Sequence, residues 1–108
     1  MIVKLGQNSS QYHDLSAGRE YAVIGIEADD LRILNDKGQP YLYPVADFEI
    51  VDFRLPEKWV VELGESGEKY AYPPALNAVG FFEDFFERKP GAVSEFWGFI
   101  NHLAATAA

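Results

Sequence analysis

The sequence predicts an α+β fold in which a small antiparallel β-barrel is followed by a β-hairpin and two C-terminal helices. Three observations lead to this prediction. Short apolar runs separated by turn residues fill positions 1–52, a second pair of such runs surrounds positions 64–67, and the apolar period becomes helical after Val79. With 108 residues the chain is expected to form a single domain with three parts, at 1–52, 53–74 and 75–108.

The first part contains five predicted strands bounded by residues that favour turns. Gly18 can take a positive φ and closes a turn over residues 15–18, while residues 35–38 (Asn-Asp-Lys-Gly) suit a tight hairpin turn. Pro44 has no amide to donate and ends the fourth strand, and Val45–Asp47 is long enough for one helical turn. The predicted strands are Ile2–Leu5, 21–26, 31–34, 41–43 and 48–53, with a polar loop from Gly6 to His13.

This part of the chain resembles an SH3-like barrel. The turn at residues 15–18 is similar to the diverging turn, residues 35–38 to the distal hairpin, and Tyr43-Pro44-Val45-Ala46-Asp47-Phe48 to the helical turn before the last strand. SH3 domains carry a Trp at the start of the third strand, over their groove for proline-rich peptides, whereas Leu31 or Arg32 stands here. Binding of proline-rich peptides is therefore not expected.

A hairpin and two helices are predicted for the rest of the chain. The hairpin strands, 59–63 and Lys69–Tyr72, flank a Gly-containing turn, and Pro73 and Pro74 end the second strand. A helix is expected from about Val79, with one side formed by Phe81, Phe82, Phe85 and Phe86. Residues 89–91 (Lys-Pro-Gly) are expected to break it before a last helix that starts near Val93 and frays after Ala104. The aromatic face can be buried within one chain or between two.

Composition indicates an acidic protein. The chain has 17 acidic and 9 basic residues, a formal net charge of −8. Nucleic acid is not expected as a ligand, because its binding depends on clusters of Lys and Arg. No apolar run approaches the about 20 residues that cross a membrane, and no cysteine is present to form a disulfide or a zinc site. We expect a cytoplasmic protein that binds neither membranes nor a cofactor, and whose most natural partner is a basic protein.

No catalytic pattern appears in the sequence. His13 and His102 are the side chains with an ordinary pKa near neutrality, and each is expected at the surface or a helix end. Carboxylates close enough in sequence to share a metal ion are Glu27, Asp29, Asp30 and Asp36, and Glu83 with Glu87. Neither set follows the spacing of a calcium loop, so solvated acidic surfaces are the simpler interpretation. We predict neither an enzyme nor a metal site.

Tyrosines near carboxylates are the pattern that points to a function. A tyrosine combines a rigid apolar ring with a hydroxyl that seeks water or a partner, which suits protein recognition. The layout, with Leu-x-x-Gly-x-x-Tyr-x-Val and a late Gly-Phe-Phe-Glu-Asp-Phe-Phe, resembles small uncharacterised bacterial proteins, some of them similar to immunity proteins encoded beside secreted toxins. We predict a non-catalytic binding protein: an acidic immunity-type inhibitor of a basic toxin or enzyme, or else an adaptor in a bacterial or phage assembly. The predicted partner-binding residues are Asp29, Asp30, Tyr41, Tyr43, Asp47, Tyr70 and Tyr72.

Overall fold

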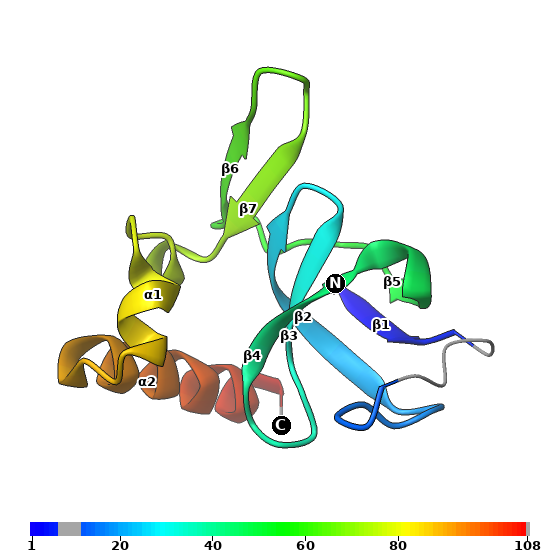
Figure 1. The fold of residues 1–108 in the computed structure, drawn as a ribbon, viewed down its shortest axis with the longest axis horizontal. Coiled ribbons are helices and arrows are strands. Elements are labelled where there is room, and N and C mark those ends of the chain that lie inside the picture. The colour runs from blue at the N-terminus through cyan, green and yellow to red at the C-terminus, as the bar shows by residue number, and fades with distance from the viewer. Residues whose placement is uncertain (7–11, 108) are drawn as a thin grey trace. The chain divides into compact units, whose positions relative to one another are not determined.

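Strands precede helices along the chain, as the computed structural model shows for residues 1–6 and 12–107 (Figure 1). The chain divides into two compact units, Met1–Tyr72 and Pro73–Ala108. The predicted α+β class, with an antiparallel sheet followed by two C-terminal helices, is confirmed. The loop predicted between Gly6 and His13 falls mainly on residues 7–11, outside the described residues.

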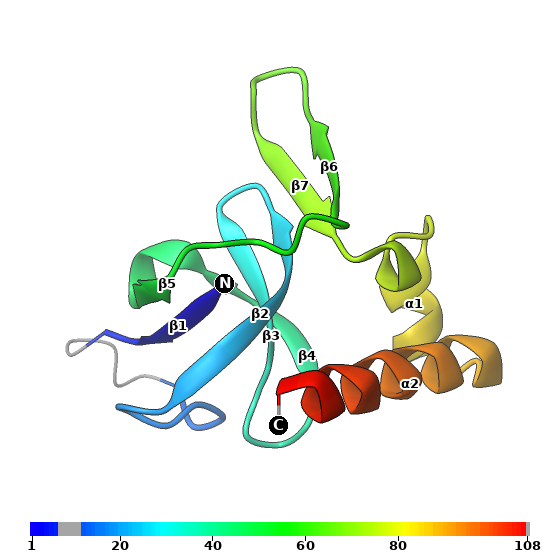
Figure 2. The ribbon, with the colours of Figure 1, turned by 180° about the vertical axis from the view of Figure 1, so that it is seen from behind.

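An antiparallel sheet forms the unit Met1–Tyr72 (Figures 1 and 2). Its main path runs β4–β3–β2–β1–β5, and β7 pairs with β2 on one side and β6 on the other. β1 pairs with the first residues of β2 and β7 with its last ones, so the two share one edge of that strand. The strands are β1 (Ile2–Leu5), β2 (Glu20–Glu27), β3 (Asp30–Leu34), β4 (Pro40–Pro44), β5 (Phe48–Asp52), β6 (Val60–Leu63) and β7 (Lys69–Tyr72).

The sheet does not close into a barrel. β4 and β5 are the two ends of the main path, and no ladder joins them within residues 1–6 and 12–72. Pro40 and Pro44 stand at the ends of β4 without amide donors, and Val51 forms a bulge where the register between β5 and β1 shifts. The predicted SH3-like barrel is therefore not confirmed, although the expected helical turn, η1 (Val45–Asp47), does lie between β4 and β5.

One apolar core lies on the inner face of this sheet. Val3 and Ile33 are fully buried, and the predicted alternation of strand residues explains which side chains reach the core. β2 is apolar on both faces, as expected, because Ile24 is an extra residue opposite β3 and is itself buried. The core consists of Val3, Leu5, Leu15, Tyr21, Val23, Ile26, Leu31, Ile33, Tyr43 and Ala71.

A carboxylate joins the two N-terminal turns outside this core. Asp36 accepts hydrogen bonds from the hydroxyl of Ser16 at 2.6 Å, from Nη1 of Arg19 at 2.7 Å and from the hydroxyl of Tyr21 at 2.7 Å. The hydrogen bond from Ser16, together with those from Tyr21 and Arg19, lowers the pKa of Asp36. Asp36, one of the carboxylates considered for a metal site, thus has a structural role.

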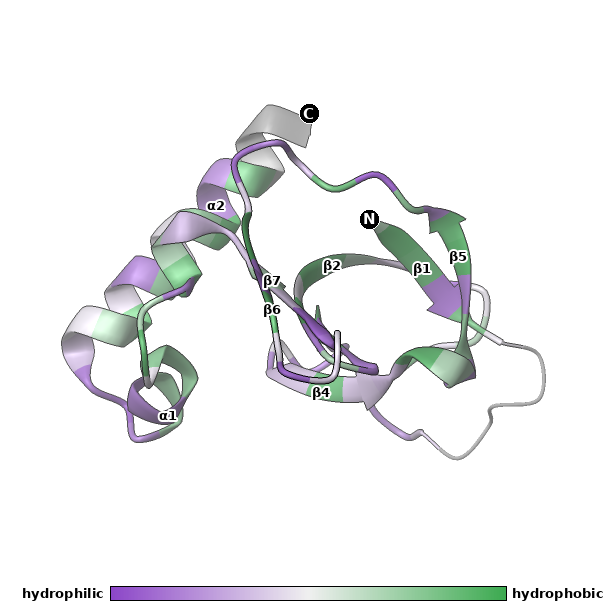
Figure 3. Cartoon of the chain, turned by 90° about the horizontal axis from the view of Figure 1, so that it is seen from above, coloured by the Kyte–Doolittle hydropathy of each residue, from purple (hydrophilic) through white to green (hydrophobic). Residues whose placement is uncertain are grey.

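Edge-on and tilted contacts between aromatic rings hold the unit Pro73–Ala108 together. Its elements are η2 (Pro74–Leu76), α1 (Phe81–Phe86) and α2 (Pro90–Ala107). The ring of Phe96 is fully buried and lies 4.7 Å from Phe85 and 6.2 Å from Phe82, measured between centroids. Hydrophilic and hydrophobic residues both occur along the whole described length of α2 (Figure 3).

The start of the last helix differs from the prediction. α2 begins at Pro90, a residue that was expected to break the helix. Proline is well suited to the first position of a helix, because its fixed φ is already helical and its missing N–H has no intrahelical partner there. The break is shorter than expected and falls between Phe86 and Pro90.

Candidate partner-binding face

Four side chains form one row across the outer face of the sheet. Glu62 pairs with Tyr70, Tyr70 with Glu27, and Glu27 with Asp30, on the successive strands β6, β7, β2 and β3. Directly paired residues in an antiparallel sheet point to the same face, so these four lie side by side. We call Glu62, Tyr70, Glu27 and Asp30 the acid row. Glu62 and Tyr70 are exposed, and Glu27 and Asp30 are partly exposed.

A close packing of Tyr72 on Gly25 supports the acid row. Tyr72 lies two residues beyond Tyr70 on β7, and Gly25 two residues before Glu27 on β2, so both belong to the neighbouring row of the same face. A Cβ atom on Gly25 would lie 2.0 Å from Cε1 of the Tyr72 ring. The ring therefore occupies the space that a side chain at position 25 would need.

A buried arginine connects this second row to the acid row. The guanidinium of Arg32, a residue only 7% exposed, donates from Nε to the hydroxyl of Tyr72 at 2.7 Å and from Nη1 to the carbonyl of Pro40 at 2.8 Å. Its Nη2 donates to Oε2 of Glu27 at 2.8 Å, and the Tyr72 hydroxyl donates to the same oxygen. Glu27 is thus held in one orientation by two donors from the protein.

The protonation states follow from these contacts. Partial burial would raise the pKa of Glu27, but the hydrogen bonds from Tyr72 and Arg32 outweigh it and hold that pKa below the ordinary value. Burial, followed by the hydrogen bond to Glu27, raises the pKa of the Tyr72 hydroxyl well above its ordinary value. Glu27 is therefore ionised and Tyr72 neutral at pH 7. Because Arg32 compensates Glu27, the charge available to a partner comes mainly from Glu62 and Asp30.

The structure separates the predicted partner-binding residues into two groups. Asp30 and Tyr70 belong to the acid row, and Asp29 is exposed in the turn between β2 and β3 beside it. Tyr72 lies in the row next to the acid row and is 8% exposed, so it supports the face rather than forming its surface.

The other three predicted residues lie away from the acid row. Tyr43 is 4% exposed and donates its hydroxyl to Asp14 at 2.8 Å, and its ring packs edge-on against Tyr12, whose hydroxyl donates to Asp47 at 2.6 Å. Tyr41 is 39% exposed and pairs with Ile33, on the face opposite to that of Asp30.

Sequence reasoning missed Glu62 and considered Glu27 only as a metal candidate. The pairing of Glu62 with Tyr70 did not follow from the predicted turn, because a hairpin centred on residues 64–67 would place Glu62 opposite Lys69, whereas in the structure Gly64 pairs with Glu68 and Glu62 with Tyr70. The pairing of Tyr70 with Glu27 had no local signal, because it joins segments far apart in the sequence.

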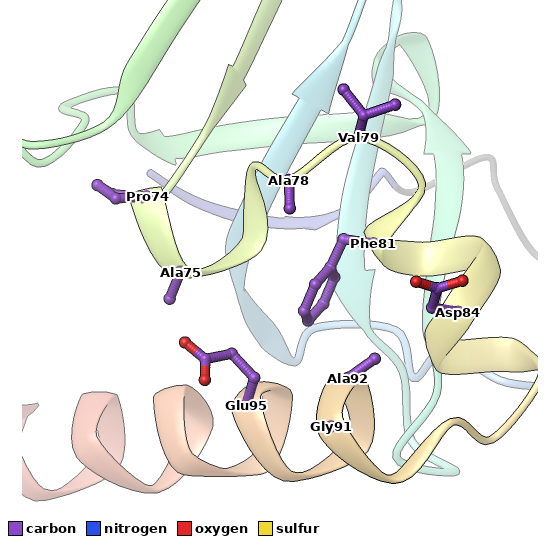
Figure 4. Close-up of a pocket in the computed structure, with 9 residues that line it drawn as sticks. All are labelled: Pro74, Ala75, Ala78, Val79, Phe81, Asp84, Gly91, Ala92 and Glu95. Carbon is purple, nitrogen blue, oxygen red and sulfur yellow. The ribbon is translucent and has the colours of Figure 1, made fainter.

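The unit Pro73–Ala108 has an open pocket of its own. Its volume is about 400 Å³, and Figure 4 shows the ring of Phe81 and the carboxylate of Glu95 directed into the space between η2 and α2. Asp84 of α1 also lines the pocket. The pocket is shallow and mostly bordered by small residues, so it has fewer recognition features than the acid row.

Neither metal binding nor membrane insertion gains support from the described residues. Within 1–6 and 12–107, no three side chains of His, Cys, Asp or Glu are grouped closely enough to hold a metal ion. In the same part of the chain, no helix is both long and apolar enough to span a membrane. Comparisons with protein-family models, with curated proteins and with solved structures find no match.

Proposed function

We propose that this protein is a non-catalytic binding domain and that the acid row is the face with which it recognises a basic protein. The observation that carries this proposal is the alignment of Glu62, Tyr70, Glu27 and Asp30 on four adjacent strands. Side chains on paired strands lose less conformational freedom on binding than side chains on loops, so their charges and the Tyr70 ring are well placed to contact a partner.

Electrostatics supports the choice of a basic partner. The unit Met1–Tyr72 contains 13 acidic and 7 basic residues, a net charge of 7 − 13 = −6 of the total −8. Such a surface attracts a positively charged protein and raises its rate of association, and the effect weakens in salt. Inhibition by occupying the basic cleft of a toxin or enzyme, as immunity proteins do, is the form of binding that we propose.

The strand connections support a finer proposal about the fold. The order β5–β1–β2–β3–β4, with η1 between β4 and β5, is the order expected of an SH3-like domain. We propose that residues 1–52 are an open variant of that architecture. The hairpin of β6 and β7 extends its sheet, because β7 pairs with the last residues of β2.

Two charge-matched double variants test the proposed function. In Asp30→Asn/Glu62→Gln the acid row loses its two available charges, whereas in Glu20→Gln/Glu57→Gln two exposed carboxylates of the same unit that do not belong to the acid row are neutralised. Each protein is immobilised at about 50 mM salt, where charge attraction is weakly screened, and challenged with the co-expressed product of the neighbouring gene. We expect the first variant to bind that product about tenfold more weakly and the second to bind within about twofold of the parent. Equal loss in both variants would show that the acid row has no special part in binding.

A further inference from the structure

β6 is an edge strand that contains neither a proline nor a bulge. Within the described residues it pairs with β7 alone, so its other side presents backbone groups to a possible partner. The other two edges are protected, β4 by Pro40 and Pro44 at its ends and β5 by the bulge at Val51. β6, with the sequence Val-Val-Glu-Leu, has neither a proline nor a bulge.

The amides that face the open side can be identified from the hairpin register. The amide of Gly64 donates to the carbonyl of Glu68 at 2.8 Å, so Gly64 is directed toward β7. Backbone groups of successive strand residues point to alternate sides, so Glu62 also faces β7 while Val61 and Leu63 face the open side.

The side chains of β6 divide between the two faces of the sheet. Val61 is 51% and Leu63 72% exposed, and both lie on the face of Ala71, which belongs to the apolar core. Glu62 lies on the other face and ends the acid row. A strand added beside β6 would therefore meet apolar side chains on one face and carboxylates on the other.

We propose that the open edge of β6 binds an extended segment of the partner as an eighth strand, and that this segment alternates apolar residues with Lys or Arg. This inference rests on the proposed function, because the acid row supplies the charge that selects the basic residues. Main-chain hydrogen bonds to Val61 and Leu63 would supply affinity, and the alternation would supply specificity. A second copy of this chain fits less well, because antiparallel pairing centred on β6 would place Glu62 beside its copy, and like charges in that position are destabilising.

The experiment uses the full chain and synthetic peptides. The probe is acetyl-Lys-Val-Lys-Val-Lys-Val-Lys-amide, with the corresponding Glu-Val peptide as the charge control and a Lys-Gly peptide as the control for strand formation. Nuclear magnetic resonance follows binding and amide hydrogen exchange residue by residue. We expect the Lys-Val peptide to slow exchange of the Val61 and Leu63 amides at least about tenfold, with no comparable change for Val60 and Glu62, which already face β7.

Two variants at one position separate the backbone contribution from the side chain. In Val61→Pro an outward amide is removed and no hydrogen bond to β7 is lost, a change that edge strands tolerate. In Val61→Thr the amide and the branched side chain are retained. We expect Val61→Pro to weaken peptide binding about tenfold, because the hydrogen bond from the amide of residue 61 to the peptide is lost. We expect Val61→Thr to change peptide binding less than about threefold.

Each result decides between strand addition and other modes of binding. Binding of the Lys-Val peptide with shifts confined to the acid row, and no protection at Val61 or Leu63, would overturn strand addition and leave the proposed function standing. Equal binding of the Glu-Val or the Lys-Gly peptide would overturn it as well, as would self-association of the chain through β6. If Val61→Pro does not fold, the exchange pattern of the unsubstituted protein decides the question.

Discussion

Substitution of Gly25 by alanine tests whether the Tyr72 ring is as firmly placed as the structure implies. The added Cβ would lie 2.0 Å from Cε1 and 2.6 Å from both Cδ1 and Cζ of that ring. Since carbon atoms in contact are about 3.5 Å apart, the ring would have to move by about 1.5 Å. Its hydroxyl bonds to Arg32 and Glu27 would then break or stretch.

The expected cost follows from these contacts. Overpacking costs about 1–3 kcal/mol, and weakening hydrogen bonds that involve charged groups costs about 1.5–3 kcal/mol. Replacing a strand glycine returns about 0.5–1 kcal/mol by restricting the unfolded chain. We therefore expect Gly25→Ala to lower the free energy of unfolding by about 2–5 kcal/mol.

Urea unfolding, followed by the fluorescence of Trp59 alone, measures this cost for the unit Met1–Tyr72. Trp59 packs against the core of the unit Met1–Tyr72, whereas Trp97 belongs to the other unit, so both the parent and the variant carry Trp97→Phe. The control is a double-mutant cycle with Tyr72→Ala, in which the space beside Gly25 is open. There we expect Gly25→Ala to be neutral or slightly stabilising. A parent-like stability of Gly25→Ala, or the same loss with and without the Tyr72 ring, would refute the steric reasoning.

Three further substitutions probe the backbone and the buried charge. Ala28 has a left-handed φ of 55° in the turn between β2 and β3, so Ala28→Gly should raise the free energy of unfolding by about 1 kcal/mol, whereas a decrease would contradict strain at this residue. Gly98 lies in α2, where an added Cβ atom would meet nothing within 4 Å, so Gly98→Ala should stabilise that helix by up to about 1 kcal/mol, read from the Trp97 fluorescence. Glu27→Gln should destabilise the protein by about 1–3 kcal/mol at pH 7, because Arg32 loses its charged partner. The pKa of Glu27 is lowered by folding, so its contribution is present above about pH 4.3 and is lost as the pH falls through the folded-state pKa. The difference between parent and Glu27→Gln should therefore shrink in acid, and a constant difference from pH 7 to about pH 3 would count against the ion pair.

The Arg32 network also bears on binding. It holds Glu27 in place and neutralises its charge, so the acid row presents a carboxylate of fixed orientation between the more available Asp30 and Glu62. Variants that disturb Gly25 or Tyr72 are thus expected to weaken both stability and partner recognition. Substitutions of Phe85 or Phe96, whose rings pack together in the other unit, should leave partner recognition unchanged.

Local residue patterns by themselves determined the strands, the turns and the helical period. Alternating apolar residues and Gly-containing turns predicted every strand within one or two residues, because side-chain direction and turn geometry depend on neighbours in the chain. The helix start at Pro90 was placed three residues late, because the same residue ends one helix and can begin the next.

Pairing between strands that are distant in the sequence decided how the sheet is assembled and which side chains form the acid row. The contact of β7 with β2 joins Glu27 to a tyrosine 45 residues away, and no local pattern specifies that neighbour or the shared register. The same pairings leave the sheet open between β4 and β5, bury Tyr43 and Tyr72, and bring Glu62 into line with Asp30. Sequence alternation determines which face a side chain takes, but only the register between strands determines which side chains become neighbours on that face.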